Sequence, residues 1–212
     1  LYDYCRQYAM ALNLCDKFDF AKMTEAKKEE LAEYLKLKNE DRFRQVLAKL
    51  QDQEKAEYLF LMLLVQNRDS KRGIPQADKV ARFPQYADYA LWEKSGLLML
   101  ENRFEEAISV CRQVDRGAAT FYRISECYVK LGKVDQAVQQ LREVENFFKD
   151  ESARACLMIA DLYGAVGRKK EQVAVLREVG RKYKQSPQAS QAHVKLEDLG
   201  YATFDGVDAA ED

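Results

Sequence analysis

The feature that most constrains this chain is a repeat of residue types in its second half. Three turn residues, Asn102, Gly132 and Gly167, each separate two stretches in which apolar residues recur every three or four positions. Such spacing puts the apolar side chains on one face of an α-helix. Gly and Asn tolerate the left-handed backbone that often ends a helix. Each turn residue is therefore predicted to join two amphipathic helices into a hairpin.

The two helices of each hairpin are predicted to approach closely. Seven positions before the turns stand the small residues Ser95, Ser125 and Ala160. Five positions after the first two turns stand Ala107 and Ala137. Small side chains at facing positions let antiparallel helices pack tightly. The third hairpin departs from the pattern, because Gln172 takes the second small position.

This pattern resembles the tetratricopeptide repeat (TPR) family, most clearly over residues 88–200. The fullest match, residues 118–149, has the family's large, small and turn residues at Phe121, Ile124, Ser125, Tyr128, Gly132, Ala137, Leu141 and Val144. It departs from the family at Phe121, where Trp is common. The resemblance implies an all-α fold in which antiparallel helical hairpins stack as a right-handed superhelix, an α-solenoid.

Three regions are expected along the chain. Residues 1–83 are predicted to form an irregular or degenerate TPR-like helical region, and residues 84–200 the TPR-like repeats with a C-terminal capping helix. In that last helix we expect Ser186 as N-cap and Pro187 at the first helical position. Residues 201–212 carry acidic side chains without a basic one and are expected to form a disordered tail.

The first region has helical stripes but no clear pairing. The stripes include Leu31, Tyr34 and Leu35, then Phe43, Val46, Leu47 and Leu50, then Tyr58, Leu61, Met62 and Val65. The polar, basic stretch 67–73 is the expected linker. The Phe83-Pro84 step is expected to end a short helix that follows it, because the residue before proline disfavours helical backbone.

Composition excludes several classes of partner. The chain has 34 basic and 35 acidic residues, a formal net charge of −1, and so lacks the basic excess of a nucleic-acid binder. Its longest apolar run, residues 59–65, is far shorter than the roughly 20 residues of a membrane-spanning helix. We expect a protein or peptide ligand, with no nucleic acid and no transmembrane segment. Oligomeric state is left open.

The start of the sequence bears on the compartment. The chain begins at Leu1, without an initiator Met or a leader-like stretch. The expected location is the cytoplasm. The alternative is the bacterial periplasm or cell envelope, if a signal peptide was removed upstream of Leu1.

Residues that could carry catalysis are scarce. The single His193 falls at a small-residue position of the capping helix, where a surface His is expected rather than a general base. No phosphate-binding or zinc-protease motif occurs. The five cysteines lack a C-x-x-C pair and are expected as buried free thiols: Cys5, Cys15, Cys111, Cys127 and Cys156. We therefore expect no enzyme, no cofactor and no metal.

The TPR resemblance implies a concave groove lined by the first helix of each hairpin. Its lining positions correspond here to Tyr89, Trp92, Met99, Tyr122, Glu126, Lys130, Arg154, Leu157 and Asp161. Aromatic side chains and Met are good anchors for a partner's apolar groups. The expected function is a non-catalytic protein–protein interaction scaffold that binds a peptide or protein segment in this groove. Trp92 and Met99 could instead pack against the preceding helices.

A basic cluster offers an alternative function. The segment 168–184 carries Glu171 and Glu178 and a larger number of bases: Arg168, Lys169, Lys170, Arg177, Arg181, Lys182 and Lys184. It could serve as an adaptor that recruits an anionic surface or an acidic partner. Because these bases are expected all around the helix, a solvated outer helix face is the simpler interpretation.

Overall fold

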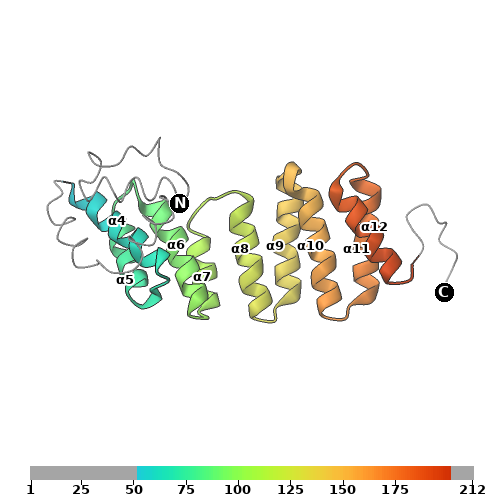
Figure 1. Ribbon diagram of the computed structural model, residues 1–212, viewed down its shortest axis with the longest axis horizontal. Helices are drawn as coiled ribbons and strands as arrows, with labels where there is room; N and C mark the ends of the chain where they lie inside the picture. The colour runs from blue at the N-terminus through green and yellow to red at the C-terminus, as the bar shows by residue number, and fades with distance from the viewer. Residues whose placement is uncertain (1–51, 202–212) are drawn as a thin grey trace, which may run out of the picture. The chain divides into compact units, whose positions relative to one another are not determined.

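A computed structural model describes residues 52–201, which form helices joined by turns and contain no strand (Figure 1). The predicted all-α fold of helical hairpins is confirmed. The chain divides into two compact units, residues 1–113 and 114–212, and each is treated separately. The stripes predicted before residue 52 and the tail predicted after residue 201 lie outside the described residues. No helix in the described range is long and apolar enough to cross a bilayer.

The described part of unit 1 contains α4 (Gln53–Gln66), α5 (Ser70–Val80), α6 (Ala87–Leu100) and α7 (Phe104–Cys111). Each helix packs on the next, and α4 also packs on α6. Leu61, Ala77, Val80 and Ala90 are buried together in one core, with three tyrosines against it: Tyr58, Tyr86 and Tyr89. The helix predicted from the Tyr58 stripe is therefore α4.

Helix α5 corrects the prediction of a linker over residues 67–73. The helix begins at Ser70, because the Asp69 carboxylate accepts a hydrogen bond of 3.1 Å from a backbone N–H of the first turn. Gly73 lets α5 approach α6, since a Cβ there would lie 2.6 Å from Leu97 Cδ1. Packing on α6 outweighs the polar composition, even with a proline inside the helix.

The second helix of the first hairpin is shorter than its apolar spacing predicts. Helix α7 ends at Cys111, although the stripe continues to Val114, which is also buried. A tight turn follows, in which the N–H of Gly117 donates to the Asp115 carboxylate over 2.9 Å. Gly117 has φ 56°, in the left-handed region that favours glycine.

Unit 2 contains α8 (Ala118–Lys130), α9 (Val134–Phe147), the 3₁₀ turn η2 (Lys149–Glu151), α10 (Ser152–Ala165), α11 (Lys169–Lys182) and α12 (Pro187–Asp198). Each α-helix packs on the next along the chain, and α10 also packs on α12 (Figure 1). Leu141, Ile159, Leu176 and Leu196, from α9 to α12, are fully buried. One continuous core therefore joins the successive hairpins of this unit.

The predicted turn positions are confirmed. Asn102, Gly132 and Gly167 have φ values of 58°, 71° and 75°. In the hairpin of α8 and α9, the buried Ser125 hydroxyl donates to the carbonyl of Ala137 over 3.1 Å. Small residues thus bring these two helices together as the repeat pattern predicted.

The third hairpin accommodates the larger side chain of Gln172 through a glycine on the facing helix. Gln172 stands where the first two hairpins have alanine. A Cβ added at Gly164 would lie 2.4 Å from Gln172 Nε2. The absent side chain at Gly164 therefore gives Gln172 its space, and α10 and α11 still pack against each other.

Candidate functional site

The predicted groove residues fall on both units. Tyr89, Trp92 and Met99 are partly buried on α6 of unit 1, and the other six lie on α8 and α10 of unit 2. Unit 2 carries the larger share, and the candidate site is built from its residues.

Three side chains of unit 2 meet where α8 faces the start of α10. The Tyr122 hydroxyl donates to Glu151 Oε2 over 2.9 Å. Arg154 Nη1 lies 3.4 Å from the same carboxylate oxygen, and its guanidinium carbon lies 5.2 Å from the centre of the Tyr122 ring. A cation at that distance over an aromatic face is attracted to it. Glu151 therefore orients both the tyrosine and the arginine.

The protonation of Tyr122 follows from its surroundings. Burial and then the hydrogen bond to the Glu151 carboxylate raise the pKa of Tyr122 well above its ordinary value. The hydroxyl therefore remains a donor at neutral pH. Arg154 keeps 61% of its side chain exposed, so this group of side chains presents an aromatic edge and a cation to solvent.

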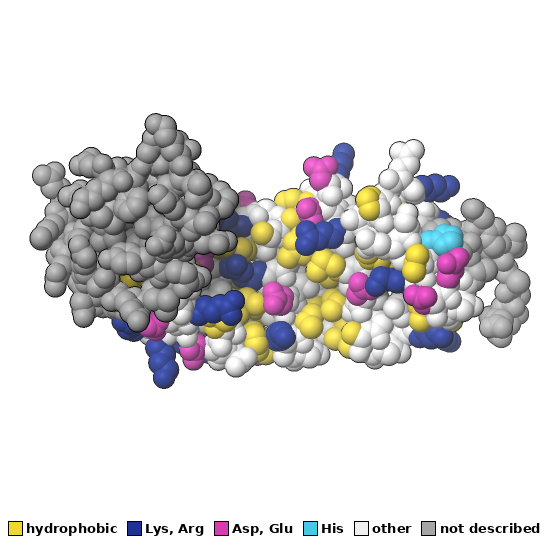
Figure 2. Space-filling view, in the orientation of Figure 1, with side chains coloured by type: hydrophobic (Ala, Val, Ile, Leu, Met, Phe, Trp, Pro, Cys, Tyr) yellow, Lys and Arg dark blue, Asp and Glu magenta, His cyan; other side chains and the backbone are white. Residues whose placement is uncertain are grey.

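We name the surface around this group the first-helix face. It consists of Tyr122, Glu126, Lys130, Glu151, Arg154, Asp161 and Lys195. Glu126 and Lys130 follow Tyr122 by four and eight positions on α8, which places them on the same side of the helix. Asp161 of α10 accepts a hydrogen bond of 2.5 Å from Lys195 of α12. Figure 2 shows hydrophobic side chains among separated acidic and basic ones over these helices.

One predicted groove residue lies in the core. Leu157 is only 7% exposed and belongs to the buried cluster of α9 to α12, against which Tyr122 packs. It therefore supports the first-helix face from beneath.

Two members of this face, Glu151 and Lys195, were not predicted from the sequence. Glu151 could have been found from its spacing, because an acid three residues before Arg154 can pair with it at a helix start. Lys195 had no such signal, since its partner Asp161 is 34 residues away.

A second group of charges connects α9, α10 and α11. We name it the Arg142 cluster: Arg142, Glu145, Cys156, Glu178, Lys182 and Tyr183. Arg142 Nη1 lies 2.5 Å from Glu145 Oε2, 3.2 Å from Glu178 Oε1 and 3.5 Å from Cys156 Sγ. Glu145, whose side chain is 2% exposed, also accepts hydrogen bonds from Lys182 (2.6 Å) and Tyr183 (2.9 Å).

Two pKa shifts fix the charges of this cluster. Burial alone would raise the pKa of Glu145, but hydrogen bonds from Lys182, Arg142 and Tyr183 lower it to about 2. Burial, with the nearby carboxylates of Glu145 and Glu178, raises the pKa of the Cys156 thiol to about 12. At neutral pH the carboxylate is therefore ionised and the thiol is protonated.

This geometry bears on metal binding. Glu145, Cys156 and Glu178 bring three possible ligand atoms within 4.8 Å of one another. One nitrogen of Arg142 is within hydrogen-bond distance of all three, so the guanidinium takes the place that a metal ion would need. A protonated thiol is also a poor metal ligand. The cluster is an ion-pair network that ties α9 to α11.

The basic segment 168–184 separates into two groups. Arg168 bonds Asp135 (2.5 Å) and Glu171 (2.7 Å), and its guanidinium carbon lies 4.6 Å from the Tyr163 ring centre. Lys182 bonds Glu145, as described above. A helical step of about 100° per residue places the remaining bases of α11 within about 120° of one another: Lys169, Lys170, Arg177 and Arg181. Arg168 and Lys182 lie on other sides of α11, so the bases are distributed around the helix, as expected.

The histidine and the described cysteines that were considered for catalysis lie at the surface and in the core, respectively. His193 lies on α12 with its Nδ1 3.5 Å from a Glu197 oxygen, and both side chains are substantially exposed. Cys111, Cys127 and Cys156 are buried free thiols, which confirms that prediction for the described cysteines. Cys5 and Cys15 lie outside the described residues.

The helical hairpins of unit 2 match known sequences. Two family models, both described as tetratricopeptide repeat, match residues 119–150 and 153–179, which are the hairpins of α8 with α9 and of α10 with α11. The chain contains tetratricopeptide repeats. A search of curated proteins gave no significant match.

Solved structures with the same helical-repeat fold include TPR and TPR-like proteins. MamA from Desulfovibrio magneticus RS-1 has 15% sequence identity and a TM-score of 0.57, with 87% of this chain and 98% of that chain covered. A kinesin light chain TPR-like repeat structure from Podosopora anserina has 15% identity, a TM-score of 0.56 and the same coverage. At this identity the likeness concerns the fold.

Proposed function

We propose that this chain is a non-catalytic TPR scaffold that binds a peptide or protein segment on the first-helix face of unit 2. The observation that carries the proposal is the meeting of Tyr122, Glu151 and Arg154. Side chains from two successive hairpins are held there by each other rather than by the core alone. A partner that lies across α8 and α10 would find these groups already oriented, which lowers the entropy lost on binding.

The chemistry of the face suits a segment with both apolar and charged side chains. Tyr and Arg are the residue types that most often dominate binding energy in protein interfaces. Glu126 and Lys130 are exposed on α8, and Asp161 is exposed on α10, so charges of both signs flank the Tyr122 group. Such charges set register and partner choice more than affinity.

The alternative, an adaptor that uses the basic helix 168–184, takes second place. Arg168 and Lys182 already form ion pairs within unit 2, which reduces the positive charge that a partner would meet.

The test begins with affinity capture by the full chain, followed by titration of a labelled segment of the captured partner. Arg154→Ala should weaken binding at least tenfold, about 1.4 kcal/mol, because it removes the exposed cation and its contact with Tyr122. Arg181→Ala is the matched control, since Arg181 is an exposed arginine on α11. Far-UV circular dichroism checks the fold of both variants.

The outcomes separate the candidates. Equal affinity of the chain and Arg154→Ala would remove the first-helix face from the proposal. A loss confined to Arg181→Ala would favour the basic-helix adaptor. Trp92→Ala, measured in the same titration, reports whether the predicted groove positions on α6 contribute.

A further inference from the structure

Glu126 and Asp161 occupy equivalent places on the first-helix face. Each stands six positions before the turn glycine of its own hairpin, Gly132 after α8 and Gly167 after α10. Because successive repeats share one register, the two carboxylates lie at the same height on neighbouring first helices. Glu126 is exposed, and the Asp161 side chain is 49% exposed. The middle of the first-helix face therefore presents a pair of acids.

Only one member of this acid pair is neutralised by unit 2 itself. The salt bridges of residues 52–201 pair Asp161 with Lys195 of α12 over 2.5 Å and do not include Glu126. Two carboxylates and one ammonium group leave a negative charge at this height. Complementary charges across an interface fix the register of a partner. The acid pair therefore suits one basic side chain of a partner, placed between Glu126 and Asp161.

Three side chains of α10 form a row that ends at this acid pair. Arg154, Met158 and Asp161 are four and then three positions apart, so they lie within about 60° of one another around the helix. Arg154 contacts Glu151 through Nη1 and is 61% exposed, and a guanidinium has further N–H donors for a second carboxylate. Met158 and Tyr122 are both partly buried against the core of unit 2. The row therefore runs from a cation through an apolar side chain to an anion.

The spacing of this row matches a helical partner better than an extended one. Arg154 and Asp161 are seven residues apart, about 10.5 Å along the axis of α10. In a partner helix, side chains at i and i+7 lie on one face with the same axial separation. In an extended partner, side chains on one face are about 6.6 or 13.2 Å apart. Neither extended spacing fits the row, so the geometry favours an amphipathic helix.

We propose that the partner of the first-helix face is an amphipathic helix that carries an acid and a base seven positions apart, with an apolar side chain midway. The acid pairs with Arg154, and the apolar side chain contacts Met158. The base lies between Glu126 and Asp161. This inference rests on the proposed function and adds to it the conformation and the charge pattern of the partner.

A displayed library of random linear peptides, selected on the full chain, tests the pattern. Peptides of about 20 residues are used, because they span about 30 Å as a helix. Enriched sequences should carry an acid and a base seven positions apart, in either order, with an apolar residue three or four positions from each. The peptide that binds most tightly becomes the probe, and its ¹³Cα chemical shifts in the complex should be those of a helix. Enrichment without this pattern, an extended bound peptide or no enrichment would overturn the proposal.

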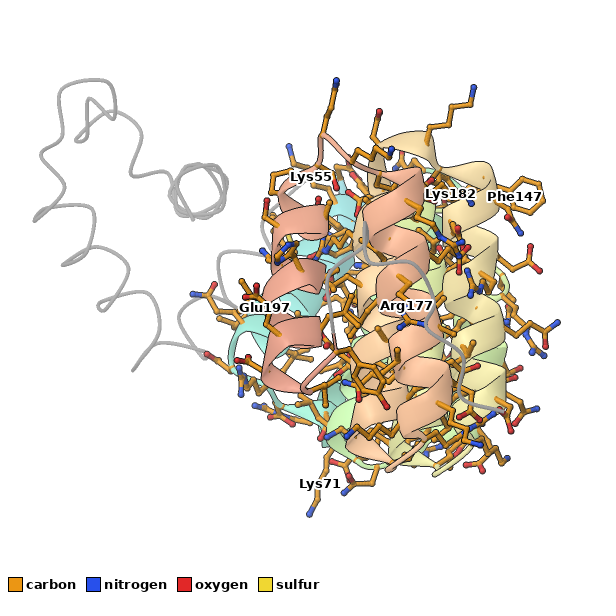
Figure 3. All side chains as sticks on the ribbon, turned by 90° about the vertical axis from the view of Figure 1, so that its right-hand side faces the viewer. Lys55, Lys71, Phe147, Arg177, Lys182 and Glu197 are labelled. Carbon is orange, nitrogen blue, oxygen red and sulfur yellow. The ribbon has the colours of Figure 1, made fainter. Side chains whose placement is uncertain are left out.

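The second helices of unit 2 supply a matched control position. Figure 3 shows α12, with Glu197, on one side of unit 2 and α9, with Phe147, on the other. Glu143 stands four positions before Phe147 and therefore lies on the same side of α9. A charge reversal at Glu143 changes the net charge as much as one at Glu126, but away from the first-helix face.

Charge reversal tests where the base of the probe binds. In a fluorescence titration, Glu126→Lys should weaken binding of the probe at least tenfold, whereas Glu143→Lys should change it less than twofold. A probe whose base is replaced by Glu should bind Glu126→Lys at least fivefold more tightly than the original probe does. Far-UV circular dichroism checks the fold of both variants. Equal effects of the two reversals, or no recovery with the altered probe, would contradict binding of the base at the acid pair.

Arg154→Ala separates this inference from the proposed function. It should weaken binding of the probe at least tenfold, because it removes the cation that pairs with the acid. If Arg154→Ala weakens binding of the captured partner but the bound peptides are not helical, the proposed function holds and the helical partner is wrong. If Arg154→Ala changes neither affinity, the proposed function fails as well.

Discussion

The Arg142 cluster and the first-helix face of unit 2 are each organised by one glutamate that accepts several hydrogen bonds. Glu145 is 2% exposed and bonds Arg142, Lys182 and Tyr183, from α9 and the end of α11. Glu151 is 37% exposed and bonds Tyr122 and Arg154. An ion pair that is removed from water is costly to break, whereas an exposed one contributes little to stability.

The Arg142 cluster and the first-helix face therefore have different roles in unit 2. The Arg142 cluster joins second helices of neighbouring hairpins around the buried carboxylate of Glu145. The first-helix face keeps its arginine largely exposed while fixing its orientation. A TPR unit can thus use similar residue types for cohesion on one side and for presentation on the other.

The largest expected effect comes from removing the buried glutamate. Glu145→Ala should lower the free energy of unfolding by about 3 kcal/mol, because Arg142, Lys182 and Tyr183 all lose a carboxylate whose side chain is only 2% exposed. Urea denaturation followed by circular dichroism measures the loss. Glu143→Ala, two residues away on α9, is the control and should change the value by less than about 0.5 kcal/mol. Equal losses in the two variants would contradict the different roles assigned to the Arg142 cluster and the first-helix face.

Acid should weaken the Arg142 cluster in a defined window. The pKa of Glu145 is lowered in the folded chain to about 2 from its ordinary value of 4.5. Its stabilisation is therefore complete above about pH 5 and is lost as the pH falls through 4.5 toward 2. The stability difference between the chain and Glu145→Gln should shrink by up to about 3 kcal/mol over this window. Urea denaturation at pH 7, 5 and 3 measures it, and a constant difference would contradict this account.

The smallest expected effect on stability comes from the exposed glutamate. Glu151→Gln should change the free energy of unfolding by less than about 1 kcal/mol, because the Glu151–Arg154 pair is substantially exposed. Affinity for the captured partner should fall nevertheless, since Tyr122 and Arg154 lose the carboxylate that orients them. Denaturation and titration of the same preparation measure the two effects. A stability loss as large as that of Glu145→Ala would show that the two glutamates have the same role.

Much of the fold was predictable because the repeat is a local pattern. The turns at Asn102, Gly132 and Gly167 follow from residues that tolerate left-handed backbone. The N-cap at Ser186 follows from its own side chain, which accepts a hydrogen bond from the N–H of Ala189 over 3.1 Å. These signals involve residues only a few positions apart and can therefore be recognised in the sequence.

The predictions from sequence were wrong where contacts between residues far apart in the chain determine the structure. The composition of the stretch 67–73 indicates a loop. Packing of Gly73 against Leu97 nevertheless keeps most of it in α5. The mixed charges of α11 indicate a solvated outer face. Lys182, however, is paired with Glu145, which lies 37 residues away along the chain. Neither partner can be identified from spacing along one helix.

The sequence alone determined that this protein is a series of helical hairpins with TPR character, because helix periodicity, small facing residues and turn residues are properties of short segments. Tertiary structure decided which charges are paired and which are presented. Arg142 of α9 and Glu178 of α11 meet only after both helices have packed on α10, and Glu151 orients Tyr122 only after α8 and the start of α10 come together. Hydrogen bonds and ion pairs act over a few ångströms, so their partners are fixed by folding and not by separation along the chain.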